Sequence, residues 1–132
     1  MLGKYDDLAG SARSRDEPWV ITHGEPKADN LLVTDDGLRL VDWDTALVAP
    51  AARDLWWVEA GSGEELARYT ELTGRRVAHD DVTFYRLQWD LADIASYVGW
   101  FTAPHARTPD TEIGWTALSE ALRLDRNWPQ LL

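Results

Sequence analysis

Residues 23–44 read HGEPKADNLLVTDDGLRLVDWD. This stretch places a carboxylate, Glu25, five residues before an amide, Asn30. It then places two further acids, Asp42 and Asp44, on either side of Trp43. Acids and an amide in this order are an unusual set for a short segment, and the rest of the sequence is interpreted around them.

A β-hairpin is predicted between the amide and the acid pair. Two β-prone runs, residues 30–34 and 38–43, flank the turn signal Asp35-Asp36-Gly37. A further β-prone run at 19–22 leads into the Gly24 turn. We therefore expect Asn30 and Asp42 to lie at the outer ends of one hairpin.

Magnesium-dependent phosphoryl transfer needs about this set of side chains. One carboxylate orients the attacking hydroxyl, while an amide oxygen and a second carboxylate hold the metal that neutralises the phosphates. His23, Gly24 and Glu25, with Asn30 closing the loop, match the spacing of the kinase pattern H-R-D-x-x-x-x-N. The alternative, a set of turn-forming polar groups, does not account for the joint order and spacing.

The combination resembles the catalytic segment of the aminoglycoside phosphotransferase and choline-kinase-like family, which is related in fold to protein kinases. Residues 49–55, APAARDL, are similar to the segment that follows the metal-binding acid in that family. Residues 96–98 and 101–105 are similar to bacterial members. The resemblance extends from about Trp19 onward and is specific over residues 22–55.

The resemblance implies a role for each site residue. Glu25 takes the place of the catalytic aspartate and steers the proton of the acceptor hydroxyl, although its side chain is one methylene longer. Asn30 and Asp42 are the implied ligands of Mg²⁺, with Asp42 bridging the metal to the phosphates of ATP. Asp44 is expected to support the metal site or touch substrate.

Four further residues are assigned supporting roles. His23 is expected to brace the loop by hydrogen bonding rather than to transfer protons. Lys27 could reach a phosphate, but a solvated lysine is favoured. Arg53 and Asp54 are expected to form a scaffold pair near the catalytic loop. The sequence offers no zinc site, because His79 and His105 have no further ligands at a suitable spacing.

Composition limits the class of protein. The 132 residues, 45% of them hydrophobic, suit a single domain over 1–132, with residues 1–17 forming a weak helix and linker. The net charge of −10 argues against nucleic acid. It favours cationic small molecules, and the alternative is that the excess of acids serves only solubility. The sequence has no cysteine, no export signal and no membrane span, which fits a cytoplasmic location.

Helices are predicted for most of the remaining chain. The pattern indicates helices over residues 3–13, 51–60, 64–73, 82–101 and 111–124, with Ser62 and Asp80 or Asp81 as N-caps. The 82–101 helix carries an apolar stripe and is expected to be the central core element. The fold class is therefore α+β and mostly α-helical, with a small hairpin carrying the site.

The expected fold is a kinase-like carboxy-terminal lobe without an amino-terminal lobe. Residues 1–132 contain no G-x-G-x-x-G, and too few residues precede His23 to build a five-stranded lobe. The leading hypothesis is transfer of the ATP γ-phosphate to a hydroxyl of a small, aminoglycoside-like or other cationic molecule, with weak activity unless that lobe is supplied. The alternative is a truncated, non-catalytic lobe that binds a partner chain or forms a homodimer, as the eight tryptophans suggest.

Overall fold

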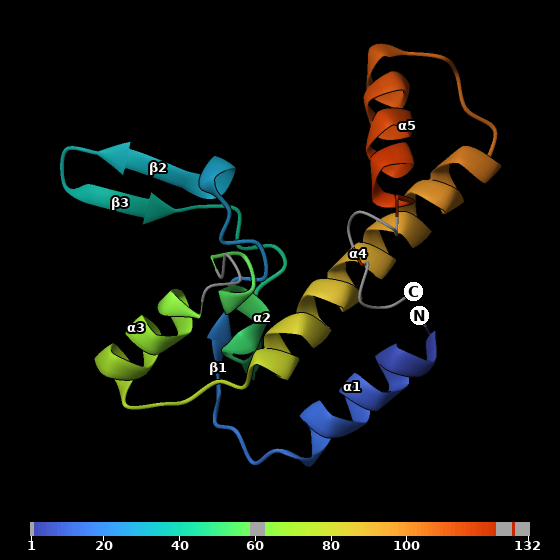
Figure 1. Cartoon of the computed structure of the whole chain (residues 1–132). Helices are drawn as coiled ribbons and strands as arrows, with labels where there is room; N and C mark the ends of the chain where they lie inside the picture. The colour runs from blue at the N-terminus through green and yellow to red at the C-terminus, as the bar shows by residue number, and fades with distance from the viewer. Residues whose placement is uncertain (1, 59–62, 124–127, 129–132) are drawn as a thin grey trace. The chain divides into compact units, whose positions relative to one another are not determined.

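The computed structural model describes residues 2–58, 63–123 and 128. It divides into two compact units, residues 7–86 and residues 1–6 with 87–132, which are described separately. Helices α1 (Leu2–Ser14) and α4 (His79–Thr102) each contribute to both units. The architecture is mixed and mostly helical, as expected, and it contains two small sheets (Figure 1). The single domain predicted over 1–132 stays a prediction.

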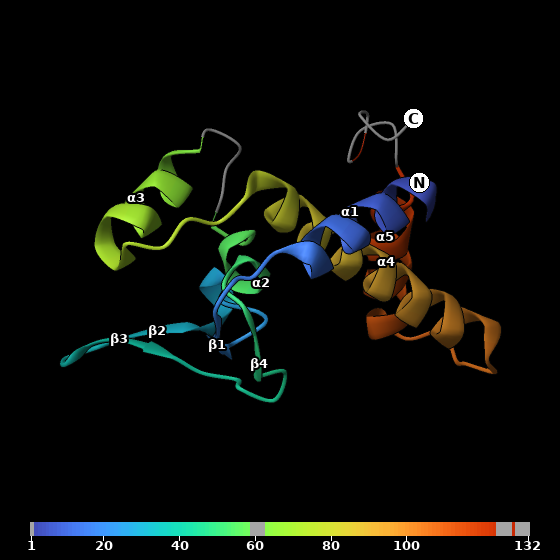
Figure 2. The same cartoon turned by 90° about the horizontal axis from the view of Figure 1, so that it is seen from below.

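The unit of residues 7–86 contains all the strands. Its elements after α1 are β1 (Trp19–Thr22), the 3-10 turn η1 (Ala28–Asn30), β2 (Leu31–Thr34), β3 (Gly37–Leu40), β4 (Leu47–Pro50), α2 (Ala52–Leu55) and α3 (Glu64–Thr73). The strands form two antiparallel pairs, β1 with β4 and β2 with β3. Figure 2 shows the β2–β3 hairpin extending away from β1 and β4.

The predicted hairpin is present, but its second strand is shorter than expected. Leu31 pairs with Leu40 and Thr34 with Gly37. The ladder gains one more bond, from Val41 N to Asn30 O at 2.9 Å, and then ends. Strand pairing was predicted to continue to Trp43, which is wrong because Asp42 has a φ of 66°, a left-handed conformation that cannot continue a strand.

Strand β4 was not predicted. Its residues pair with β1 from Thr22↔Leu47 to Trp19↔Pro50. Pro50 suggested only a break, but proline is tolerated at the end of an edge strand, where its missing N–H is not needed. The pairing matters for the site, because it fixes the strand that runs directly into His23.

Helix α2 is much shorter than the predicted helix over 51–60. It ends at Leu55 and turns through Val58, and residues 59 and 60 lie outside the described residues. The Trp57 indole donates a hydrogen bond to Gly24 O at 2.7 Å. This tertiary contact replaces the continued helical turn that the local sequence favours.

Helix α3 has the predicted bounds. It begins after Gly63 and ends at Gly74, both at positive φ, while the predicted cap Ser62 lies outside the described residues. The helix adds nothing to a core, since no residue of α3 is buried and Leu72 is 70% exposed.

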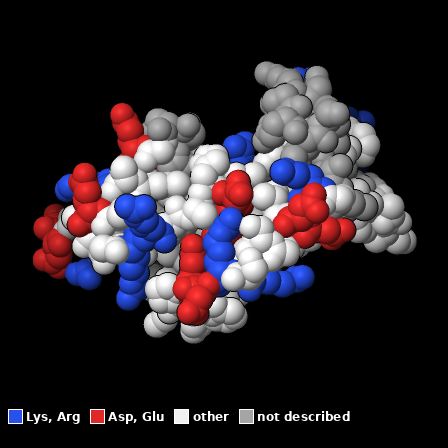
Figure 3. Space-filling model, turned by 60° about the horizontal axis from the view of Figure 1, so that its bottom comes forward, with Lys and Arg blue, Asp and Glu red and all other residues white. Residues whose placement is uncertain are grey.

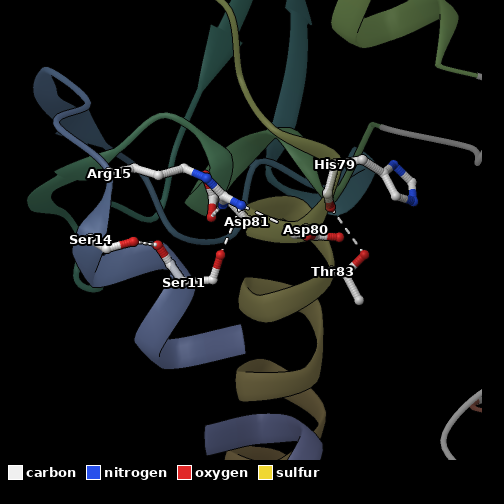
Figure 4. Close-up of polar contacts among 7 residues, drawn as sticks. All are labelled: Ser11, Ser14, Arg15, His79, Asp80, Asp81 and Thr83. Carbon is white, nitrogen blue, oxygen red and sulfur yellow. Dashed lines mark hydrogen bonds and ion pairs between the residues drawn. The ribbon is translucent and has the colours of Figure 1, made fainter. Parts of the chain in front are cut away.

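The segment after α1 is held by an ion-pair cluster (Figure 4). Arg15 forms an ion pair with Asp81, which is only 3% exposed. Arg15 Nη2 also lies 3.7 Å from Asp80 Oδ2. Arg15 Nη2 also donates to Ser11 Oγ at 2.9 Å. Burial, followed by the charge of Asp81, raises the pKa of Glu17 above its ordinary value. The predicted linker is therefore anchored to the start of α4.

The second unit contains the rest of α4 and α5 (Pro109–Ala121). Helix α4 begins at His79 rather than residue 82, so Asp80 and Asp81 occupy its first turn. Helix α5 begins at Pro109 rather than 111, because Thr108 caps it by accepting a hydrogen bond from Thr111 N.

The core of the second unit is small. Leu87, Leu118 and Trp128 are buried, and Trp128 Nε1 donates to Asp90 at 2.6 Å. Val98 in α4 and Trp115 in α5 are exposed, although both are apolar residues of predicted helices. The apolar stripe therefore buries only part of its length within the described residues.

Charged groups are spread over the surface. Figure 3 shows one face on which acidic and basic side chains are interspersed. Among the described helices, none is long and apolar enough to cross a membrane.

Candidate functional site

The loop after β1 is anchored by a carboxylate from α2. Asp54 Oδ2 accepts a hydrogen bond from His23 N at 2.8 Å, and Oδ1 accepts one from Gly24 N at 2.7 Å. Gly24 has a φ of 98°, and a Cβ there would lie 2.5 Å from Arg53 Nη2. Only glycine suits both the backbone angle and the close approach of Arg53.

Arg53 joins the loop to the segment before β4. Its Nη1 donates to Thr22 Oγ1 and its Nη2 donates to Thr45 O, each at 2.8 Å. Thr45 Oγ1 in turn donates to His23 O at 2.8 Å. Asp54 therefore holds the backbone of the loop, and Arg53 joins the end of β1 to Thr45. They act through separate partners, since no ion pair joins them in the described structure.

His23 connects the loop to the open end of the hairpin, just after β3. Its residue is buried, Nδ1 accepts from Glu25 N at 3.1 Å, and Nε2 lies 2.8 Å from Val41 O. Because a carbonyl only accepts, Nε2 carries the hydrogen and Nδ1 is free to accept. The ring also meets Trp43 edge-on at 4.7 Å. Both ring nitrogens of His23 are therefore engaged by the chain itself.

Asn30 links Glu25 to the strand that leads to Asp42. Its Nδ2 donates to Glu25 O at 2.9 Å, and its own carbonyl accepts from Val41 N at 2.9 Å. Asp42 thus directly follows the residue bonded to Asn30. Asn30 is only 7% exposed, yet no described residue donates to its Oδ1. This buried acceptor is available to a cation.

Asp42 and Asp44 face solvent. Both residues are exposed, and within the described chain neither forms a hydrogen bond or an ion pair. Aspartate is among the few residues that tolerate the left-handed conformation of Asp42. The Trp43 indole between them donates to Leu40 O at 2.8 Å, which fixes the turn after β3.

Glu25 forms an ion pair with Lys27. Lys27 Nζ lies 3.0 Å from Glu25 Oε2 and 6.0 Å from the centroid of the Trp57 ring. The hydrogen bond to Glu25 raises the pKa of Lys27, and the charges of Asp29 and Asp42 act in the same direction. The sequence favoured a solvated Lys27, whereas the structure gives it a specific partner.

Three residues of the site were not identified from the sequence. Thr45 and Trp57 contact the loop through a hydroxyl and an indole N–H, and Thr22 Oγ1 accepts a hydrogen bond from Arg53 just before the loop. Isolated threonines carry no spacing signal. Trp57 was assigned to a helix that ends before it, so its contact with the loop could not be deduced.

The residues present fit a magnesium site of limited protein coordination. No group of three His, Cys, Asp or Glu side chains in the described residues could hold a metal ion. Magnesium in phosphate-transferring sites is usually held by one or two carboxylates together with substrate phosphates and water. The amide oxygen of Asn30 and the carboxylate of Asp42 are oxygen donors of the kind that such a site uses.

Comparison with known proteins places the chain in a family. Residues 4–79 match the phosphotransferase enzyme family, APH. Protein StrN of Streptomyces griseus is 35% identical over 112 residues, which are 85% of this chain and 32% of StrN. The chain therefore spans about a third of the length of this curated relative.

The fold is similar to that of spectinomycin phosphotransferase APH(9)-Ia. For its crystal structure in complex with ADP and spectinomycin, the TM-score is 0.71 at 22% identity, over 90% of this chain and 39% of that chain. For its AMP-bound complex, the TM-score is 0.62 at 20% identity, over 92% and 42%. Because the family match includes more than half of its residues, the chain belongs to the phosphotransferase enzyme family.

Proposed function

We propose that residues 22–55 form the catalytic segment of a kinase-like carboxy-terminal lobe that transfers the ATP γ-phosphate to a hydroxyl of a small molecule. The supporting observation is the Val41 N to Asn30 O bond of 2.9 Å, which brings Asn30 and Asp42 to the same end of the hairpin. The bond from Asn30 Nδ2 to Glu25 O ties the third residue to the same place.

Each polar residue of the site has a distinct role in this proposal. Glu25 orients the acceptor hydroxyl and takes its proton, while Asn30 Oδ1 and Asp42 hold Mg²⁺. When bound, Mg²⁺ supplies the positive charge that offsets the phosphates. Asp44, exposed beside Asp42, supports that site or contacts substrate. The loop itself stays in place through Asp54 and Arg53.

The acceptor is proposed to be cationic. The net charge of −10 favours cations, and one solved relative was crystallised with spectinomycin and ADP. A cytoplasmic site of action, where ATP is available, is part of the proposal.

A paramagnetic ion tests the location of the metal site without requiring activity. Mn²⁺ with ATP should broaden the NMR signals of the Asn30 side-chain amide and the Asp42 backbone amide first. Asp42→Asn keeps the shape and the tolerance for positive φ, so it should remove the broadening without unfolding the chain. Broadening confined to other regions would show that Asn30 and Asp42 do not share a metal.

Turnover tests the role of Glu25. With Mg²⁺, labelled ATP and spectinomycin as the first acceptor, phosphate transfer should fall by roughly 100-fold or more in Glu25→Gln. Asp35→Asn, which removes an exposed acid in the hairpin turn, is the matched control. Equal turnover in wild type and Glu25→Gln would remove Glu25 from the chemistry.

A second candidate function is a non-catalytic module that binds a partner chain or a second copy. The observation that favours it is exposed apolar surface on the strands, where Trp19 is 68% exposed and Val33 is 85% exposed. Light scattering should then give a dimer whose mass falls in Val33→Asp. A monomer in both proteins would contradict self-association.

A further inference from the structure

Glu25 stands where the family resemblance implies an aspartate, and its longer side chain needs to be held. An extra methylene adds a rotatable bond, so fixing the carboxylate in one position costs more conformational entropy. A misplacement of about 1 Å can reduce turnover by roughly 100-fold. The structure should therefore contain groups that fix this carboxylate, and two neighbours of Glu25 meet that need.

Lys27 holds one carboxylate oxygen. Its Nζ lies 3.0 Å from Glu25 Oε2, and the two side chains are partly exposed. Exposed pairs contribute little to stability, so the value of this pair lies in orientation. With Oε2 engaged by the ammonium, Oε1 is the oxygen that remains for the acceptor hydroxyl.

Trp57 contacts a residue on each side of Glu25 in the sequence, Gly24 and Lys27. Its Nε1 donates to Gly24 O at 2.7 Å, which fixes the backbone just before Glu25. Its ring lies 6.0 Å from Lys27 Nζ, within the range in which an ammonium is attracted to an indole face. The ring is itself packed on Trp56, with centroids 4.1 Å apart. A single indole thus supports the residues on either side of Glu25.

We propose that Lys27 and Trp57 are positioning residues for Glu25, with Lys27 fixing Oε2, Trp57 supporting Lys27, and Oε1 left to face the acceptor. This inference rests on the proposed function. In the transfer step, the hydroxyl proton passes to Oε1 as the acceptor oxygen bonds to the γ-phosphorus. The bond from phosphorus to the bridging oxygen breaks, and ADP leaves with its electron pair.

Carbodiimide cross-linking tests the geometry in the chain itself, without activity. The reagent joins an amine and a carboxylate in contact as an amide, and the elements of water lost by the pair convert the carbodiimide to a urea. Lys4 and Lys27 are the two lysines of the sequence, so the products are few. After digestion with trypsin, wild type should give a peptide of residues 16–39 whose mass is lower by one water and which is not cut at Lys27. Fragmentation in the mass spectrometer should place the link at Glu25.

Variants of Trp57 separate its two contacts. Trp57→Phe keeps an aromatic face but loses the N–H donor, and Trp57→Leu loses both, so the Glu25 link should decrease in the first and fall severalfold in the second. Labelling of Lys4 by an amine reagent provides the internal control for lysine reactivity. A link to Asp29 alone, or equal yields in wild type and Trp57→Leu, would overturn the inference.

Kinetics separates this inference from the proposed function. Lys27→Met should lower kcat by roughly 10- to 100-fold with little change in KM, and Lys27→Arg should restore part of the loss. If Glu25→Gln abolishes transfer while Lys27→Met equals wild type, the positioning role is wrong and the proposed function stands. If Glu25→Gln has no effect, the proposed function fails, and the cross-link still reports whether the ion pair exists.

Discussion

Replacing Asp54 by alanine should release the loop that carries Glu25. The carboxylate accepts two hydrogen bonds from backbone N–H groups, at 2.8 Å from His23 and 2.7 Å from Gly24. Hydrogen bonds to a charged group contribute about 1.5–3 kcal/mol each when buried. Because Asp54 is half-buried, water can replace part of this, and we expect a loss of about 3 kcal/mol for the two bonds together.

Hydrogen exchange measures this effect at the two amides concerned. Since each 1.4 kcal/mol corresponds to about a tenfold change in an equilibrium constant, the His23 and Gly24 amides should exchange roughly 100-fold faster in Asp54→Ala. Amides of the β2–β3 ladder, which do not contact Asp54, should change much less unless the whole unit unfolds. The free energy of unfolding in urea gives the global part of the loss.

Two variants make the result decisive. Asp54→Asn keeps one acceptor oxygen and should fall between wild type and Asp54→Ala. Asp35→Asn removes an equal charge from the exposed hairpin turn and should leave both amides unchanged. If Asp54→Ala and Asp35→Asn give the same exchange rates at His23 and Gly24, the loop is not held by Asp54 and the reasoning fails.

Two other substitutions test the packing and the charges of the same unit. Gly24→Ala should lower the free energy of unfolding by about 3 kcal/mol, because the new Cβ meets Arg53 at 2.5 Å and the backbone is held at a φ of 98°; a urea midpoint equal to wild type would contradict this. Burial, and then the charge of Asp81, raises the pKa of Glu17, so its stabilising contribution is present below the ordinary value of 4.5 and is lost as the pH rises through the higher folded-state pKa. Glu17→Gln, which cannot ionise, should therefore gain thermal stability relative to wild type as the pH rises from about 4 towards neutrality, and a constant difference would refute the sign.

The hairpin could be predicted because its signals are local. An Asp-Asp-Gly turn between two β-prone runs specifies a short antiparallel pair, and the pairing itself places Asn30 near Asp42. The helix over 64–73 was equally accessible, since glycines at both ends mark where it starts and stops. No distant residue is needed for either conclusion.

The missed features depend on contacts between distant residues. Strand β4 exists because it pairs with β1, about 28 residues earlier in the chain, and its own sequence ends in a proline. Helix α2 stops early because the Trp57 indole is bonded to Gly24 rather than carried round a further turn. Local propensity favours the longer helix, and tertiary contacts override it.

The pairing of Lys27 with Glu25 shows a further limit of pattern reasoning. Side chains two residues apart in an extended strand share a face, but their Cα atoms are separated by about 6.6 Å along the strand. Lys27 and Glu25 instead lie in a turn in which Lys27 N bonds to Glu25 O at 2.8 Å, and the two side chains form an ion pair. The sequence specifies the residue types, and the backbone conformation decides that they meet.

Four of the described acids, Asp42, Asp44, Asp54 and Asp81, differ in what they face. Asp54 and Asp81 accept bonds from the chain itself, so their charges are compensated within the fold. Asp42 and Asp44 face solvent with no such partner among the described residues, so their charges remain available to a cation. Removing Asp54 should therefore change stability directly. Removing the charge of Asp42 should change metal affinity and leave stability nearly unaltered.

A double measurement of unfolding and Mn²⁺ binding on Asp54→Asn and Asp42→Asn distinguishes these roles. If Asp42→Asn destabilised the fold as much as Asp54→Asn, Asp42 would be a structural acid. The proposal that Asp42 binds a metal at the end of the hairpin would then be contradicted.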